Sequence, residues 1–258
     1  MRISDKPGPI LTILLFVAGI LSLFIVWALI PEEGHRLAVP LSATLESIAD
    51  LARSGILMRD ITASVVRVTC GIGLAIFVCI NIVCIAGFVR GTLPYLSGII
   101  DMFRPIPPIA WTPLAIIAFG IGDLSAILIV AIGAFFPIFS GVVQGYNSLH
   151  RNHLLSARSL GASSAMIFWR ITLPAISPYV SNGLRLGVGL GWFSVVAAEM
   201  VGANSGLGYA IQLASLNLEI EKIYAYLLTI AVVGLMFQLI VTLIDNRFNS
   251  WRRGEFSG

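Results

Sequence analysis

The chain has few residues of the types that carry out covalent or metal-dependent chemistry. It contains only two lysines, Lys6 and Lys222, and neither ends a GxxxxGK[ST] phosphate-binding loop. Its three histidines, His35, His150 and His153, lie outside the long apolar runs, which argues against haem or metal binding by histidine within those runs. A GxSxG motif is also absent from the sequence. We therefore expect no catalytic residues, no metal site and no cofactor in this chain.

Four charged residues are the remaining functional candidates, because they lie in or near apolar runs. These are Arg67, Arg104, Arg185 and Glu199. An ionisable group in a bilayer costs roughly 2.5 to 3.5 kcal/mol unless it faces protein or water. For Arg67 and Arg104 the alternative is that each snorkels to the membrane interface or supports a kinked backbone. Arg185 and Glu199 are almost four helical turns apart, so they cannot pair with each other.

Small residues near these charges suggest close helix packing. Gly183, Gly187 and Gly191 recur every four residues, which produces a smooth ridge that a second helix can approach closely. The ridge could serve static packing or a helix that moves beside a pathway. Cys70, Cys79 and Cys84 fall in one apolar run without metal-ligand spacing, so we expect them to pack among apolar groups.

The composition places these residues in an integral membrane protein. Apolar residues make up 57% of the chain, charged residues make up 11%, and the mean hydropathy is +0.94. Soluble domains carry about 25% charged residues. The apolar runs are long and unbroken rather than alternating, which favours helices over a barrel. A net charge of +3 without a basic and aromatic patch gives no indication of nucleic-acid binding.

The apolar runs predict an all-α membrane domain with six transmembrane helices. A cleaved signal peptide is the alternative for the first apolar run. This run is longer than the apolar region of a signal peptide, and no cleavage site follows it. Between the first two spans, leucines and isoleucine at helical spacing after Pro40 predict an amphipathic helix on the membrane surface. The expected spans are residues 9–30, 61–88, 96–120, 124–145, 175–201 and 223–244, with a loop at 202–222.

The third span should be broken near its start. Four prolines occur between Arg104 and Pro113, and such a segment cannot form a regular helix. Its freed carbonyl groups require protein or water around them. Basic residues then predict the orientation: with a cytoplasmic N-terminus, nine would lie inside and four outside. Both termini and the polar segment 150–174 are therefore expected in the cytoplasm.

The segment 150–174 carries a resemblance to a known family. It reads Ser156-Ala157-Arg158-Ser159-Leu160-Gly161, then nine residues, then Ile171-Thr172-Leu173-Pro174. This is similar to the EAA loop of the permease subunits of ABC importers. Leu155 and Ser156 stand where that family has Glu and Ala. Gly161 permits a bend between two short helices, and Pro174 suits a helix start. A helical loop lying on the lipid surface is the alternative.

Further segments resemble the nitrate, taurine, aliphatic sulfonate and bicarbonate group of these permeases. They are FRPIPPIAWTPLAIIAFGIGD, GAFFPIF, GLRLGVGLGW and AAEMVGANSGLGY, beginning at Phe103, Gly133, Gly183 and Ala197. The resemblance implies a type I importer permease fold in a bacterial inner membrane. The implied partners are a dimer of ABC ATPase subunits that binds ATP and Mg, a second permease copy, an extracytoplasmic solute-binding protein and the lipid bilayer.

The resemblance also implies which residues act. The expected ATPase-coupling residues are Leu154, Leu155, Ser156, Ala157, Arg158, Gly161, Ala162, Ile171, Leu173 and Pro174. The expected pathway residues are Arg104, Pro107, Pro108, Trp111, Arg185, Trp192 and Glu199. The solute would be a small anion or zwitterion; the alternative is a heteroaromatic vitamin or pyrimidine precursor. Two functions of another class stay open, an ion-gradient transporter and a membrane scaffold.

Overall fold

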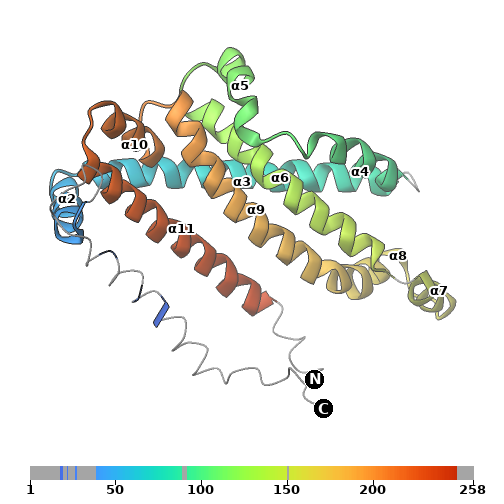
Figure 1. Ribbon diagram of the computed structural model, residues 1–258. Coiled ribbons are helices and arrows are strands. Elements are labelled where there is room, and N and C mark those ends of the chain that lie inside the picture. The colour runs from blue at the N-terminus through green and yellow to red at the C-terminus, as the bar shows by residue number, and fades with distance from the viewer. Residues whose placement is uncertain are drawn as a thin grey trace, which may run out of the picture.

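The computed structural model describes residues 39–88, 92–149 and 151–248, together with Ala18, Gly19, Ser22 and Trp27. Every regular element in these ranges is a helix (Figure 1). The elements are α2 (Leu41–Arg53), α3 (Ile56–Phe88), α4 (Thr92–Phe103), η1 (Pro108–Trp111), α5 (Thr112–Phe119), α6 (Asp123–Asn147), α7 (Arg151–Ser159), α8 (Ser164–Ile167), η2 (Phe168–Thr172), α9 (Leu173–Gly202), α10 (Leu207–Leu216) and α11 (Ile220–Phe248).

Four of the described helices are long and apolar enough to cross a membrane. They are Ile56–Cys84, Asp123–Asn147, Ala165–Gly202 and Ile220–Asp245. A fifth span is possible if the bent pair of α4 with η1 and α5 counts as one. These helices correspond to the predicted spans 61–88, 96–120, 124–145, 175–201 and 223–244. The predicted span 9–30 lies outside the described residues apart from four isolated positions.

The predicted break in the third span is confirmed. The helical segments Leu93–Phe103 and Pro108–Phe119 are bent by 83° relative to each other. Pro107 is extended, and Pro108 begins the short 3-10 turn η1. Because proline has no N–H and blocks the preceding helical turn, the backbone at 104–108 leaves the helix and restarts in a new direction.

The centre of the fold is the antiparallel pair of α6 and α9 (Figure 1). Small residues bring their backbones together, since a Cβ atom added to Gly183 would lie 2.7 Å from the carbonyl oxygen of Pro137. One added to Gly187 would lie 3.0 Å from the carbonyl oxygen of Ala134. The predicted glycine ridge of α9 therefore faces α6. Helix α3 crosses this pair, and α11 packs beside α9.

The prediction of a loop over 202–222 is wrong, because residues 207–216 within it form α10 and residues 220–222 already belong to α11. The residues Leu207, Ala210, Ile211 and Ala214 are buried along one face. Their spacing of three and four residues is that of an amphipathic helix. Gly206, with φ of 106°, supplies the turn into the helix. Helix α2 confirms the predicted helix after Pro40, and it packs against α11 and α3.

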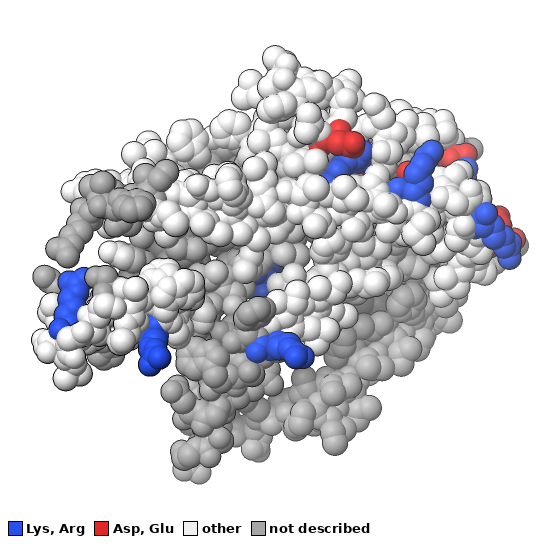
Figure 2. All heavy atoms as spheres, turned by 180° about the vertical axis from the view of Figure 1, so that it is seen from behind, with Lys and Arg blue, Asp and Glu red and all other residues white. Residues whose placement is uncertain are grey.

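Charged side chains lie toward the ends of the molecule. Figure 2 shows acidic and basic groups at the end formed by α2, α5 and α10, and mainly basic groups at the opposite end, near α7. Between them the visible described surface is largely uncharged. This distribution suits a protein whose middle lies in lipid.

Candidate functional site

The segment after α6 forms a helix, a bend and a second helix. Helix α7 ends at Ser159, and Gly161 adopts φ of 79°, a left-handed conformation that favours glycine. Helix α8 follows, and the π turn η2 leads into α9 with Pro174 in its first turn. From Ala165 to Gly202 the helix is continuous, so η2 accommodates Pro174 without a break. The segment extends from the α6–α9 pair at the end opposite α5 and α10 (Figure 1).

Large apolar side chains are exposed on this segment. Leu160 is 88% exposed, Trp169 is 65% exposed and Met166 is 50% exposed, whereas Ile167 is buried and anchors α8. Exposed apolar groups on a helical projection are typical of a surface that docks onto a partner. Among the expected coupling residues, Leu155, Ser156, Arg158, Gly161 and Leu173 are exposed, Ala157, Ala162, Ile171 and Pro174 are half-buried, and the side chain of Leu154 is not described.

The expected pathway residues lie in three separate places. Arg104, Pro107, Pro108 and Trp111 belong to the broken segment between α4 and α5, and Arg104 is exposed. Arg185 of α9 is half-buried and forms an ion pair with Asp245 of α11. Trp192 is buried against Phe237 of α11, with ring centroids 5.5 Å apart. Whether these residues line a pathway stays a prediction.

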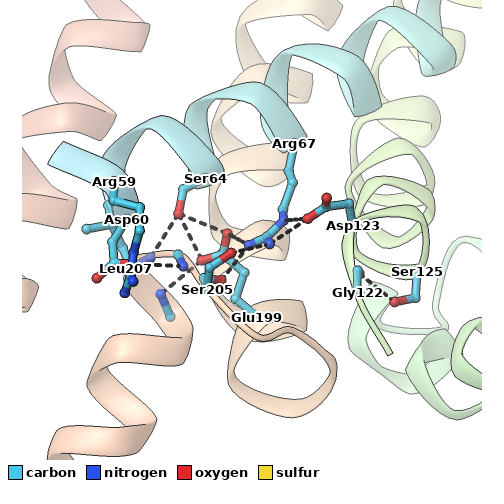
Figure 3. A network of polar contacts seen from close by, with 12 residues as sticks. Arg59, Asp60, Ser64, Arg67, Gly122, Asp123, Ser125, Glu199, Ser205 and Leu207 are labelled. Atoms are coloured by element: carbon cyan, nitrogen blue, oxygen red, sulfur yellow. Dashed lines mark hydrogen bonds and ion pairs between the residues drawn. The ribbon is translucent and has the colours of Figure 1, made fainter. Parts of the chain in front are cut away.

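Glu199 belongs to a buried ionic cluster at the end of the molecule where α6 begins and α9 ends (Figure 3). Its side chain is fully buried, and its Oε1 atom lies 2.7 Å from a terminal nitrogen of Arg67. The hydroxyl of Ser64 donates to both carboxylate oxygens at 2.9 Å, and the N–H of Gly208 donates to Oε2 at 2.9 Å. These donors hold the carboxylate in a place that water does not reach.

Arg67 of α3 binds the start of α6, the end of α9 and the turn before α10. Its Nε and a terminal nitrogen donate to Asp123 at the start of α6, at 2.8 and 2.6 Å. It also donates to the carbonyl oxygen and the hydroxyl of Ser205, at 2.6 and 2.9 Å. With the bond to Glu199, all five N–H groups of the guanidinium have acceptors. Arg67 is only 2% exposed, so the snorkelling alternative is wrong for this residue.

The cluster extends along one face of α3. Ser64 accepts from the N–H of Leu207 at 2.9 Å, and buried Asp60 lies 3.4 Å from the N–H of Gly206 and 3.4 Å from the hydroxyl of Tyr226. Asp60, Ser64 and Arg67 are four and three residues apart, which places them on the same side of a helix. The cluster therefore fixes the start of α10 against α3.

Most of this cluster was not predicted from the sequence. Asp60 falls one residue before the predicted second span, and Asp123 falls in the predicted turn between two spans. The spacing of Asp60, Ser64 and Arg67 was the available signal, since it places three polar groups on one face of a helix. Their partners at Asp123, Glu199 and Ser205 could not be read from spacing, because they come from other helices.

Comparison with known proteins identifies the family. The profile of the binding-protein-dependent transport system inner membrane component family matches residues 84–250, which is more than half of the chain. The chain belongs to this family. It is an ABC transporter permease, and its long apolar helices are those of a multi-pass protein of the inner membrane.

Relatives of the permease cover most of its length. A permease protein of an ABC transporter from Brucella abortus is 34% identical over 226 residues, 88% of this chain and 90% of the relative. The taurine transport system permease protein of Escherichia coli is 34% identical over 76% of this chain and 71% of its own length. The bicarbonate transport system permease protein of Synechococcus elongatus is 31% identical over 93% and 87%.

A solved structure has the same fold. It is a chain of the MetNI methionine ABC transporter in inward-facing conformations, with a TM-score of 0.63 and 19% sequence identity. The likeness covers 74% of the permease and 95% of that chain. The all-helical architecture described above is therefore a fold that ABC transporters use.

Proposed function

We propose that this permease is the membrane subunit of an ATP-driven importer and transmits movement from a separate ATPase to a pathway through the membrane. In this proposal α7 and α8 dock onto the ATPase, and residues 9–30 supply a sixth span. The observation that carries the proposal is the projecting segment with exposed Leu160, Met166 and Trp169 at the end of the α6–α9 pair. Arg158 and Arg170, both exposed there, suit the cytoplasmic side.

The remaining partners follow from the family description. A permease of a binding-protein-dependent system requires a solute-binding protein, which would dock at the end opposite α7, and an ATPase dimer, which would supply ATP and Mg binding. We propose that a second permease copy completes the pathway. The permease itself would carry no catalytic residue.

The docking surface is tested by association with the ATPase. Leu160→Glu places a charge on an 88% exposed leucine of the projecting segment, and Leu216→Glu does the same at a 71% exposed leucine of α10. In cells that express the whole transporter, we expect Leu160→Glu to abolish copurification of the ATPase and Leu216→Glu to preserve it. Equal copurification with both variants would refute the assignment of α7 and α8. ATP-dependent uptake in vesicles separates the importer from an ion-gradient transporter or a scaffold.

For the solute, we propose a small organic or inorganic anion or a zwitterion. The relatives named for taurine and bicarbonate transport support this class. Arg104 supports it independently, because this exposed cation lies at the break of the third span, where no ion pair to it is formed by the described residues. Arg185 contributes less, since Asp245 compensates its charge. A cation beside a path of low dielectric attracts an anion.

One observation favours the second solute class, a heteroaromatic compound. A cavity of about 380 Å³ lies between α3, α4, η1 and α6, and no charged side chain lines it. Its walls include four aromatic side chains, and such walls suit a ring better than a hydrated inorganic anion. The aromatic residues are Phe103, Trp111, Phe135 and Phe136.

A further inference from the structure

The two carboxylate partners of Arg67 differ sharply in burial. The side chain of Glu199 is fully buried, whereas that of Asp123 is 72% exposed. Both lie within 2.7 Å of the guanidinium. An ion pair between exposed groups contributes little to stability, while the loss of one partner from a buried pair is costly. The pair with Asp123 has one exposed partner, so it costs less to open than the fully buried pair with Glu199.

Arg67 does not depend on Asp123 for its position. Without Asp123 it would keep Glu199 at 2.7 Å and both bonds to Ser205. Glu199 is in turn held by Ser64 and by the N–H of Gly208. The inner part of the cluster therefore stays assembled when the outer ion pair breaks, because Glu199 still neutralises the guanidinium and three of its five N–H groups keep their acceptors, while the two that Asp123 releases turn to water.

Asp123 begins α6 directly after a turn that is built on two glycines. Gly120 and Gly122 have φ of 77° and 144°. Helix α5 before the turn follows the bend of 83°, and its Ile117 is 82% exposed. The N–H of Gly122 also donates a hydrogen bond of 2.9 Å to the carbonyl oxygen of Gly202, which attaches this turn to the end of α9. Glycines at both sides of Ile121 allow this turn to change direction.

We propose that the ion pair of Arg67 with Asp123 is a releasable latch. When closed, it joins Asp123, directly after the turn between α5 and α6, to Arg67 of α3, which also binds Glu199 of α9 and Ser205 before α10, as Figure 3 shows. When open, it weakens the attachment of this turn, so that α5 can shift while Glu199 retains Arg67. Arg67 and Glu199 are thus positioning residues for the broken third span. This inference rests on the proposed function, because the movement is driven by the cycle of the ATPase.

The latch is tested by measuring the distance between α5 and α10 in the assembled transporter. Spin labels at Ile117→Cys and Leu216→Cys occupy exposed positions on these helices, in a chain whose three native cysteines are replaced. Labelled permease is diluted with unlabelled permease so that distances within one copy dominate. We expect the distance distribution to differ between nucleotide-free and ATP-trapped states, and Asp123→Asn to shift the nucleotide-free distribution toward the ATP-trapped one.

Two control variants sharpen the test. Asp123→Glu keeps the carboxylate and should show the wild-type distance distribution. Asp101→Asn removes an exposed carboxylate of α4 and should leave the distance distribution unchanged. The latch is overturned if ATP-dependent uptake is intact but the wild-type distance distribution is the same in the nucleotide-free and ATP-trapped states. It is also overturned if Asp123→Asn leaves the nucleotide-free distribution unchanged. Absence of ATP-dependent uptake in the wild type would instead overturn the proposed function and the latch with it.

Discussion

Alanine at Gly183 should destabilise the permease, whereas alanine at Gly189 of the same helix should not. A Cβ atom at position 183 would lie 2.7 Å from the carbonyl oxygen of Pro137 and 3.2 Å from the Cα atom of Gly141. Both contacts are with backbone of α6, which cannot rotate away as a side chain can. At position 189 an added Cβ meets nothing within 4 Å. Gly183→Ala therefore forces α6 and α9 apart.

The size of the effect follows from overpacking. An extra methyl group in a close-packed site costs about 1 to 3 kcal/mol. The gain from replacing glycine by alanine within a helix, about 0.5 to 1 kcal/mol, applies to both variants and cancels in their comparison. For a chain of this size, about 1 kcal/mol shifts the midpoint of thermal unfolding by roughly 2 to 4 °C. Gly183→Ala should therefore unfold roughly 2 to 12 °C below Gly189→Ala.

The assay compares the thermal midpoints of the two purified variants in the same detergent. Intrinsic tryptophan fluorescence is a suitable probe, because Trp192 of α9 is buried in the packed region. A midpoint of Gly183→Ala equal to or above that of Gly189→Ala would refute the inference that the glycine ridge sets the distance between α6 and α9.

Two further predictions concern the charged residues. Glu199→Gln should lower the free energy of unfolding by about 3 to 5 kcal/mol, because it removes the buried charged partner of Arg67. Asp123→Asn should lower it by less, because this side chain is 72% exposed and its amide oxygen can still accept from Arg67. Equal thermal midpoints for the two variants would contradict the burial argument. Arg104→Ala and Arg185→Ala should lower uptake of a small anion, and Arg104→Lys should retain it. Unchanged anion uptake in both alanine variants, together with uptake of a heteroaromatic solute, would favour the second solute class.

The long elements of the fold could be predicted because lipid imposes a simple pattern. A span of apolar residues has to satisfy its own backbone, so length and composition define it. The prolines between Arg104 and Pro113 likewise predicted the break of the third span, because the effect of proline on a helix is local. Helix α10 escaped prediction because Gly202, Gly206 and Gly208 suggest a loop. The signal for a helix was the three- and four-residue spacing of its apolar residues from Leu207 to Ala214.

The ionic cluster shows where sequence reasoning ends. Arg67 and Glu199 could be identified as costly charges in apolar surroundings, but their pairing joins residues 132 positions apart. Such a pairing depends on how α3 crosses the α6–α9 pair, and that crossing depends on the shape of every contact between the three helices. Local patterns predicted which residues required partners. Only the fold identifies the partners.

The α6–α9 pair connects the two ends of the molecule that these predictions address. At one end it continues into α7 and α8, and at the other Asp123 begins α6 and Glu199 lies in the last turn of α9. The 25 residues of α6 extend over about 37 Å at 1.5 Å per residue. Close contact with α9 runs from Gly133 to Gly145 of α6, so this part of the pair resists bending, whereas Asp123 in the first turn of α6 lies beyond it. A displacement of α7 and α8 by an ATPase would be carried along this stiff part toward the latch at Asp123, and Gly183→Ala, which loosens the pair, should weaken that connection as well as stability.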